Sequence, residues 1–475
     1  MRAGGRGRAG TARKVLVAVT VLLVLAAATV VGLDASGHLP GGILGEAAPS
    51  PSPSPSPSPK PSPAGPVLTP VTASAGGPAA FDERLLSDPD LGGDPGAYVV
   101  DAVTGEVLLD RSGAEPRTPA SVSKLATAAA ALMVLEPDLR LVTRTVTGAQ
   151  PGEVVLVGGG DTTLTFRPPK AAAYPQPASL TALADATAAA LRTQATDRVT
   201  VRVDDSLFSG PAVSPDWRPS YVASGVVSRV SALSVDAGRV RPGFSKRVQD
   251  PALEAGRRLA RLLAARGLSV APEVTRQVPA PAASALAAVS SPELPSLVET
   301  MLSTSDNDLA ESLARLAAAA RGEPASFAGI SSVLPDVITE LGVPTGGLEL
   351  LDGSGLARAS TIAPETLGQL LAVAARGEQP RLRPLVTGLP VASFTGTLAD
   401  RFGATGPRAG AGLVRAKTGT LTGVASLAGI ATQPGVAGDR LLAFALLTDD
   451  VAPTDALTAR DALDLIAAAF TRPDG

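Results

Sequence analysis

The distribution of hydrophobic residues separates an apolar N-terminal segment from the rest of the chain. Residues 15–33 form a run of 19 residues without a charge, and the 14 residues before it contain five basic side chains and no acid. About 20 apolar residues span a bilayer, whereas the apolar core of a cleaved signal has only ~7–15. A basic flank predicts a cytoplasmic N-terminus. We therefore expect residues 1–34 to form a cytoplasmic tail and a single-pass anchor in the plasma membrane, with the rest of the chain at its extracytoplasmic face. The alternative is a cleaved signal and a secreted protein.

A stretch rich in Pro and Ser follows the apolar segment. Residues 49–63 alternate Ser and Pro around Lys60. Such a repeat forms an extended, semi-rigid polyproline spacer of about 3.1 Å per residue. We interpret residues 35–80 as a linker that holds the remainder of the chain away from the membrane.

From residue 81 onward, strand-like and helix-like patterns follow one another. Residues 97–109 resemble a hairpin closed by a Thr-Gly turn, and residues 145–240 are rich in Val, Thr, Gly and Pro, which predicts mostly strands. Residues 423–431 and 440–447 are two apolar strand patterns. Helical patterns occupy residues 121–135, 253–267, 294–302, 308–321 and a final segment from residue 453.

Two of these predicted helices should differ in their exposure to solvent. Residues 121–135 carry almost no charge beyond Lys124, so this helix should be buried on all sides. Residues 253–267 carry four Arg among Leu and Ala, which predicts an exposed amphipathic helix. Helices packed on an antiparallel sheet give the α+β fold class.

The composition excludes several kinds of site. The chain has no Cys, and its single His, His38, lies in the linker. A Ser-His-Asp triad, a Cys-His pair, a zinc site and a disulfide are therefore excluded. The net charge of −3 gives no electrostatic reason to expect nucleic acid as a partner. We expect no cofactor and no metal.

Ser121 and Lys124 lie three residues apart at the start of the charge-poor helix. Residues at this spacing share a helix face, so the hydroxyl and the amine should lie within hydrogen-bond reach. The helix N-terminus also directs free backbone N–H groups toward whatever Ser121 attacks. The alternative is an N-capping Ser beside a solvated Lys. A lone charge in an apolar helix needs a partner or a shifted pKa, which disfavours that alternative.

A second motif, Ser305-Asp306-Asn307, lies between two helical patterns and contains the one Asn of the chain. All three residue types cap helices well, so a helix N-cap is the alternative interpretation. The position of the one Asn in this motif favours a functional role.

A third motif, Lys417-Thr418-Gly419-Thr420, opens a strand pattern. A cation, a hydroxyl and a Gly in succession make a strand edge that can bind a carboxylate, because Gly lets a substrate backbone approach closely. An exposed strand entry is the alternative.

The three motifs occur in the order used by serine penicillin-recognising enzymes, in which a Lys rather than a His activates the Ser. Of the four Lys after residue 81, two lie in the two motifs that require one. The combination therefore points to Lys-activated serine chemistry, which suits a chain without a usable His.

Longer stretches around these motifs resemble the class C low-molecular-mass penicillin-binding proteins, the D-alanyl-D-alanine carboxypeptidase/endopeptidases of the DacB type. The stretches are PASVSKLATAAAAL from Pro119, LVGGGDTTL from Leu156, DGSGLAR from Asp352 and RAKTGTLTGV from Arg415. The resemblance covers roughly residue 81 to the C-terminus. It implies a discontinuous transpeptidase-like catalytic domain of residues 81–145 and 285–475, with an inserted mostly-β domain of residues 146–284 between the first two motifs.

The resemblance also implies catalytic roles. Ser121 is expected to be the acylated nucleophile and Lys124 its general base. Ser305 is expected to relay a proton to the leaving amine with the help of Lys124, and Asn307 to bind the substrate amide. Lys124 must be neutral to act as a base, and burial beside the cation of Lys417 should lower its pKa.

The resemblance also implies which residues bind the substrate. Lys417 and Thr418 are expected to hold the terminal carboxylate of D-alanyl-D-alanine beside Gly419. Thr420 is expected to add a hydroxyl to this carboxylate site and, together with Ser121, to supply the backbone N–H groups of the oxyanion hole. Arg358 follows a Gly-Ser-Gly turn in a family loop that lines the cleft, and we expect it to meet the peptide stem of the substrate.

Two further features concern the inserted residues. The Gly158-Gly159-Gly160 run lacks the Gly-Lys-Ser/Thr end of a phosphate loop and is interpreted as a structural turn. Family members often place an Asp shortly after a Trp, where it binds the free amine of a diaminopimelate stem. Here no acid occurs in the five residues after Trp217, so that preference is not expected.

The sequence thus predicts a serine D-alanyl-D-alanine carboxypeptidase, with endopeptidase activity open. Its expected partners are peptidoglycan stem peptides that end in D-Ala-D-Ala, and β-lactam antibiotics as inhibitors. A β-lactamase-like hydrolase on the same fold is one alternative, but the one Asn is already used at Asn307, so a deacylating Glu-Asn pair is not available. A non-catalytic wall-binding protein is the other alternative.

Overall fold

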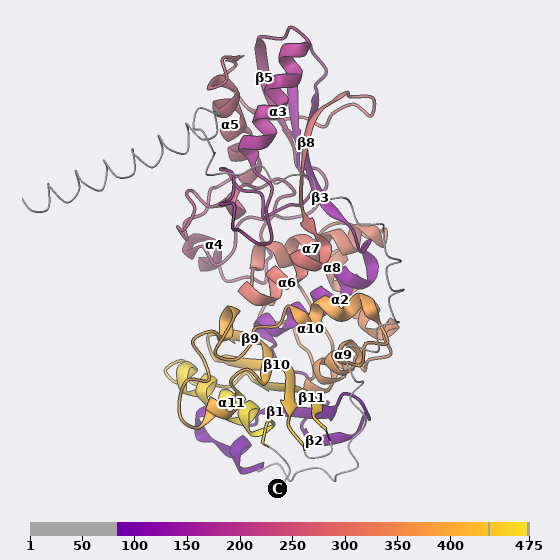
Figure 1. Ribbon diagram of the computed structural model, residues 1–475, viewed down its shortest axis with the longest axis vertical. Helices are drawn as coiled ribbons and strands as arrows, with labels where there is room; N and C mark the ends of the chain where they lie inside the picture. Colours follow the sequence, from indigo (N-terminus) through magenta and orange to yellow (C-terminus); the bar gives the residue numbers. More distant parts are fainter. Residues whose placement is uncertain (1–82, 436–437, 473–475) are drawn as a thin grey trace, which may run out of the picture. The chain divides into compact units, whose positions relative to one another are not determined.

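Two β-sheets and the helices around them make up residues 83–435 and 438–472, the parts that the computed structural model describes (Figure 1). The predicted tail, anchor and linker, residues 1–80, lie outside these parts. Within the described ranges, no helix combines the length and the hydropathy that a membrane span requires.

The first sheet is antiparallel and runs in the order β2-β1-β11-β10-β9. Its first two strands confirm the predicted hairpin, and its long C-terminal strands coincide with the two apolar patterns. The strands are β1 (Gly96–Asp101), β2 (Val107–Arg111), β9 (Val414–Leu421), β10 (Val424–Gln433) and β11 (Arg440–Thr448).

Helices cover both faces of this sheet. Alternate residues of a strand point to opposite faces. In β1, Val100 therefore joins the core on the side of α9 (Pro364–Arg376), and Val99 joins the core on the side of α11 (Ala456–Ala469). Burial on both faces explains why every residue of β1 is buried.

The second layer is built around a helix without an exposed face. α2 (Lys124–Val134) is buried from Lys124 to Leu132, which confirms the burial that its charge-poor pattern predicted. It packs against α6 (Leu294–Thr304), α7 (Asn307–Ala320) and α8 (Phe327–Glu340). The helices α8 and α9 were not among the helical patterns identified in the sequence. The remaining short helices are η1 (Glu83–Ser87), η2 (Pro89–Leu91), η3 (Ala120–Ser123), α4 (Ser220–Ser224), η4 (Asp236–Gly238), η5 (Pro380–Leu382), α10 (Arg383–Thr387), η6 (Gly396–Leu398) and η7 (Pro407–Gly410).

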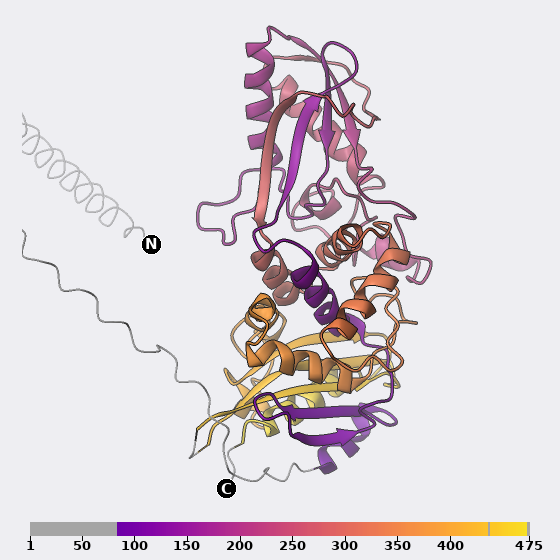
Figure 2. The same ribbon diagram turned by 90° about the vertical axis from the view of Figure 1, so that its right-hand side faces the viewer.

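The second sheet is mixed and has the order β6-β5-β4-β3-β8, with β7 paired to β5. Helices α3 (Leu180–Thr193) and α5 (Pro251–Ala264) share one hydrophobic core with it. The predicted limits of the insertion lie at two paired strands, β3 and β8, which run side by side in Figure 2. Residue 146 is inside β3, and residue 284 directly precedes β8. The strands are β3 (Arg140–Thr147), β4 (Glu153–Val157), β5 (Arg198–Asp204), β6 (Ser269–Val270), β7 (Thr275–Arg276) and β8 (Ala285–Glu293).

The prediction that residues 145–240 are mostly strand is wrong at α3. The side chain of Ser179 accepts a hydrogen bond from the Ala182 N–H at 3.2 Å and caps this helix. Its buried residues recur at helical spacing, as Leu180, Leu183 and Leu191 show. The Val-, Thr- and Pro-rich surroundings concealed this short periodicity.

The helix predicted at residues 253–267 is also only partly as expected. α5 is amphipathic, but Arg258 is buried rather than exposed. Its guanidinium lies 2.8 Å from the carboxylate of Asp236 and 3.2 Å from that of Glu254. Two carboxylates compensate the loss of water around this cation.

One buried ion pair holds α11 to the loop before β9, and its removal should weaken the fold. Arg401 Nη2 lies 2.6 Å from Asp464 Oδ1, and the two side chains are only 7% and 3% exposed. Asp464→Ala leaves the buried guanidinium without its partner, so the free energy of unfolding should fall by about 3–5 kcal/mol. Asp461→Ala, at a residue of the same helix whose side chain is 67% exposed, should change it by less than about 0.5 kcal/mol. Urea denaturation of both variants measures the difference, and equal effects would contradict the role of this pair.

Candidate active site

The first and second motifs meet at one nitrogen atom. Ser121 lies in η3, directly before α2, and its Oγ accepts a hydrogen bond from Lys124 Nζ at 2.9 Å. The same Nζ donates to Asn307 Oδ1 at 2.7 Å and to the Ser354 carbonyl at 2.5 Å. The predicted proximity of Ser121 and Lys124 is therefore present, and Asn307 joins them from the start of α7.

The third motif contacts the second one. Lys417 lies in β9, and its Nζ donates to Ser305 Oγ at 2.9 Å and to the Thr418 carbonyl at 2.8 Å. Ser305 ends α6 with a φ of 57°, a left-handed conformation that is uncommon for Ser. Ser305 is thus bound by Lys417, whereas Lys124 is bound to Asn307. The expected help of Lys124 to Ser305 is not a direct hydrogen bond.

The strand β9 lies directly against the Ser121 turn. A Cβ atom at Gly419 would lie 2.7 Å from the Pro119 carbonyl, 3.1 Å from the Ser121 nitrogen and 2.1 Å from Ser426 Oγ. Only a residue without a side chain fits between these groups. Gly419 therefore brings the backbone of β9 next to the N–H of Ser121.

The hydroxyls on either side of Gly419 have defined positions. Thr418 Oγ1 lies 3.0 Å from Thr397 Oγ1, and Thr420 Oγ1 donates to the Gly419 carbonyl at 2.8 Å. β9 is the last strand of the first sheet. These two hydroxyls and the Lys417 cation thus come from the outermost strand of the sheet.

Burial changes the acidity of both lysines. Lys124 is completely buried, and this burial lowers its pKa to about 8, while the carboxylates of Asp352 and Glu311 act in the opposite direction. Burial, followed by the cations of Lys124 and Arg401, holds the pKa of Lys417 well below its usual range. The pKa of Lys124 is lowered by burial, as expected, whereas the cation of Lys417 is not among its main causes.

A buried loop, residues 352–357, completes the surroundings of Lys124. The Asp352 carboxylate accepts the N–H groups of Gly355, Leu356 and Ala357 at 2.7–3.0 Å, which turns the chain sharply. A Cβ at Gly355 would lie 2.0 Å from the Ala120 carbonyl. The loop was interpreted as a tight turn, and it is one, but it also presents a carbonyl to Lys124.

Sequence reasoning missed the acidic residue behind this loop. Glu311 on α7 accepts the N–H groups of Gly353 and Ser354 at 3.1 and 2.9 Å and pairs with Arg315 at 2.8 Å. Glu311 lies four residues after Asn307, on the same helix face. That spacing is the signal in the sequence that could have revealed it.

Arg358 lies at the edge of the site. Its Nη1 donates to the Thr422 carbonyl at 2.7 Å, and Arg218 donates to Thr422 Oγ1 at 3.0 Å. Thr422 lies in the turn between β9 and β10, and a contact between Arg358 and a peptide stem stays a prediction.

The Gly-rich run before Asp161 is a structural turn, as interpreted from the sequence. A Cβ at Gly159 would lie 2.2 Å from the Val142 carbonyl, and the Gly160 carbonyl accepts the Ser312 hydroxyl at 2.5 Å. Across residues 83–435 and 438–472, no group of three or more acidic, His or Cys side chains is placed to hold a metal ion.

Comparison with known proteins gives the family. A family model described as the D-Ala-D-Ala carboxypeptidase 3 (S13) family matches residues 79–246 and 241–470. The chain belongs to this family. It is therefore a serine-type D-Ala-D-Ala carboxypeptidase and a hydrolase, as the ordered motifs predicted.

Individual proteins are similar to this chain over most of its length. Carboxypeptidase DacB of Mycolicibacterium smegmatis is 39% identical over 417 residues, which cover 85% of this chain and 87% of that protein. The D-alanyl-D-alanine carboxypeptidase of Actinomadura sp. strain R39 is 30% identical over 485 residues, with coverages of 83% and 86%. The structure of penicillin-binding protein 4 from Haemophilus influenzae has a TM-score of 0.66 at 22% identity and covers 82% of this chain and 96% of that one. This likeness confirms the α+β fold class.

The lowered pKa of Lys124 predicts how acylation depends on pH. Only the neutral amine can take a proton from Ser121, and a pKa of about 8 leaves most of the amine protonated at pH 7. The second-order rate of acylation by a fluorescent penicillin should therefore rise about tenfold per pH unit below this pKa and level off above it.

Two Lys→Arg variants test the origin of this profile. Lys124→Arg should show no acylation at any pH, because a guanidinium stays protonated. Lys170→Arg, at an exposed position, should keep the wild-type profile. A wild-type rate that does not change with pH would show that Lys124 is not the base.

Proposed function

We propose that Ser121 is the nucleophile of a D-Ala-D-Ala carboxypeptidase that acts on peptidoglycan stem peptides. The observation that carries this assignment is the 2.9 Å contact between Ser121 Oγ and an amine, Lys124 Nζ, whose burial favours its neutral form. A neutral amine at this distance can accept the hydroxyl proton while the oxygen attacks a carbonyl.

The reaction proceeds in two halves. Ser121 Oγ attacks the carbonyl carbon of the penultimate D-Ala, its proton passes to Lys124, and a tetrahedral oxyanion forms. The peptide C–N bond then breaks, and the terminal D-Ala leaves with a proton relayed through Ser305, which Lys417 holds at 2.9 Å. Water hydrolyses the acyl ester, and Ser121 regains its proton.

The groups around Ser121 suit the two ends of such a substrate. Lys417, Thr418 and Thr420 hold the terminal carboxylate, and Gly419 allows the substrate backbone to lie close to β9. Asn307 hydrogen-bonds the amide on the other side of the scissile bond. A β-lactam presents a carboxylate and a reactive amide in a similar arrangement, so we propose that it acylates the same hydroxyl.

A β-lactamase would need a further group that activates water for rapid deacylation. Glu311, a buried acid on α7, already accepts hydrogen bonds from Gly353, Ser354 and Arg315. We therefore expect a penicilloyl adduct that persists for minutes to hours. Rapid turnover of penicillin would favour the β-lactamase-like alternative.

A pair of Ser→Ala variants tests the proposal. Ser121→Ala should lower the release of D-Ala from a pentapeptide ending in D-Ala-D-Ala by at least about 10³-fold and should abolish the penicillin adduct. Ser123→Ala should retain both activities, since its hydroxyl lies in the same turn but has no hydrogen-bond partner among the described residues. Peptide mass analysis locates the adduct. An adduct at another residue, or full activity of Ser121→Ala, would refute the assignment and favour a non-catalytic wall-binding role or a different nucleophile.

We also propose that residues 15–33 anchor the enzyme at the extracytoplasmic face of the plasma membrane. The basic flank and the uncharged run of 19 residues support this proposal. After cell fractionation and carbonate extraction, the full chain should remain with the membrane, whereas a chain lacking residues 1–34 should not. A chain lacking only residues 49–63 is the control and should stay membrane-bound. Recovery of the full chain in the culture medium would indicate a cleaved signal instead.

A further inference from the structure

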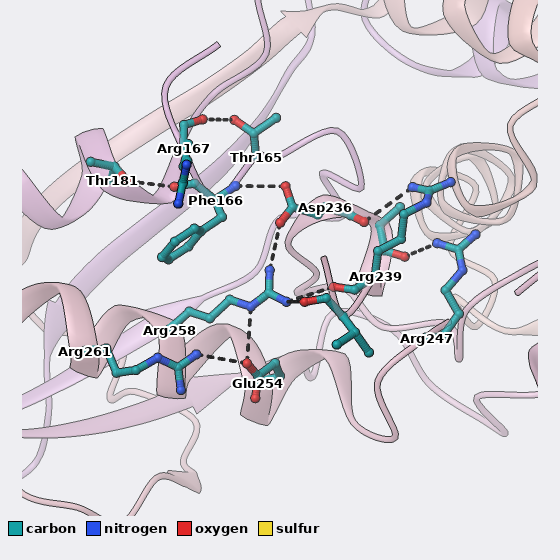
Figure 3. Close-up of polar contacts among 12 residues, drawn as sticks. Thr165, Phe166, Arg167, Thr181, Asp236, Arg239, Arg247, Glu254, Arg258 and Arg261 are labelled. Carbon is teal, nitrogen blue, oxygen red and sulfur yellow. Dashed lines mark hydrogen bonds and ion pairs between the residues drawn. The ribbon is translucent and has the colours of Figure 1, made fainter. Parts of the chain in front are cut away.

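A large groove opens beside the second motif. It has a volume of about 830 Å³ and lies between α6 and two loops of the inserted residues, 162–177 and 225–245. This size falls in the range of roughly 300–1,000 Å³ that is typical of binding sites for small organic groups. Three of its lining residues, Thr165, Asp236 and Arg239, are labelled in Figure 3.

The groove is bordered by two chain segments that also reach the candidate active site. Asp306 lines the groove and is the middle residue between Ser305 and Asn307. Gly225 also lines it, and the carbonyl of the next residue, Val226, accepts the side-chain N–H of Asn307 at 2.9 Å. Because Asn307 is proposed to bind the substrate amide away from the terminal carboxylate, the groove borders the chain segments that would meet this part of the substrate.

The lining combines hydroxyls with exposed aromatic rings. Thr300 and Thr304 contribute side-chain hydroxyls, and Tyr174 and Phe244 are 88% and 59% exposed. Exposed rings of this size bury little apolar surface in the free protein, so they are available to stack on a ligand.

Arg239 is the unusual cation of this region. Arg258 pairs with Asp236 and Glu254 (Figure 3), and Arg247 pairs with Asp308 at 2.9 Å. The guanidinium of Arg239 has no carboxylate partner in residues 83–435 and 438–472, and its one hydrogen bond there is a long one, 3.4 Å, to the Asp236 carbonyl. Most of its five N–H donors are therefore free to bind oxygen atoms of a ligand.

We propose that this groove binds the glycan strand to which the stem peptide is attached, so that the enzyme recognises amino-sugar units together with the peptide. The inference rests on the proposed function. A pyranose ring has an apolar face of C–H groups, which suits Tyr174 and Phe244, and a rim of hydroxyl and acetamido groups. The acetamido and ring oxygens accept from Arg239, and the hydroxyls donate to Asp306 and to the threonine oxygens.

The residues that line the groove favour a sugar over a second peptide strand as its ligand. An extended peptide needs a row of backbone partners, which a sheet edge provides, but the groove is lined by helix side chains and loops. A strongly acidic ligand would meet the carboxylates of Asp236 and Asp306. An uncharged ligand with alternating apolar faces and hydroxyls suits both the aromatic rings and the mixed charges.

The experiment compares two substrates of the full chain, a free pentapeptide and the same pentapeptide linked to its amino-sugar disaccharide. The disaccharide should lower the KM for D-Ala release about five- to tenfold and leave kcat unchanged. This is the gain in affinity expected from one or two stacking contacts. The double variant Tyr174→Ala/Phe244→Ala should lose this gain, and Arg239→Ala should lose most of it. Leu457→Ala removes a 65% exposed side chain on α11, away from the groove, and should keep the gain.

Several controls separate this inference from the proposed function. All variants should keep the wild-type KM for the free pentapeptide, the wild-type rate of penicillin acylation and the wild-type melting temperature. Failure of wild type to cleave the pentapeptide would contradict the proposed function. In that case the groove is tested by the binding of the peptide-free disaccharide, which saturation-transfer NMR measures on wild type and on the double variant.

Three results would overturn the inference. The first is an equal KM for both substrates together with no binding of the free disaccharide. The second is a gain that survives in the double variant, which would locate the sugar elsewhere. The third is an equal, groove-dependent gain from a sugar-free cross-linked peptide dimer, which would make the occupant a peptide.

Discussion

The buried amine of Lys124 is the constraint on which the rest of the structure depends. Removing an ammonium group from water costs several kcal/mol unless polar groups replace its hydration shell. Here that shell consists of the Ser121 hydroxyl, the Asn307 amide oxygen and the Ser354 carbonyl, all within 2.9 Å. Three segments that are far apart in the sequence must therefore meet at one nitrogen, and the packing of α6, α7 and α8 around α2 makes this possible.

The inserted residues belong to the same arrangement. The Trp217 ring N–H donates to Asp352 at 2.7 Å, and the Val226 carbonyl accepts from Asn307 at 2.9 Å. The Arg247 guanidinium pairs with Asp308, next to Asn307. The first two contacts connect the insertion to the loop that binds Lys124 and to Asn307, and the third connects it to the residue after Asn307. The insertion thus stabilises the geometry of the site, and in Figure 1 its loops and α4 lie beside the ends of α6 and α7.

Most elements of the fold could be predicted, because their signals are local. Alternation in the C-terminal strands, the missing charges of α2 and the amphipathic pattern of α5 depend only on neighbouring positions. The prediction failed at α3, where a helix of mostly Ala and Leu lies in a Val- and Thr-rich context. It also failed for Arg258, whose burial depends on the carboxylate of Asp236, which comes from a distant loop. A helical wheel shows which face is polar, but it does not show whether a partner covers that face.

The sequence by itself determined the chemistry of the site, because the spacing of Ser121 and Lys124 fixes their contact within one helical turn and because no His or Cys competes for the role of base. Only the tertiary structure decided the partners of each group. It pairs Ser305 with Lys417, places the Ser354 carbonyl against Lys124 and lowers the pKa of Lys124 mainly by burial. Backbone carbonyls have no signature in the sequence, and desolvation depends on every segment that excludes water, so these features arise only when distant segments pack together.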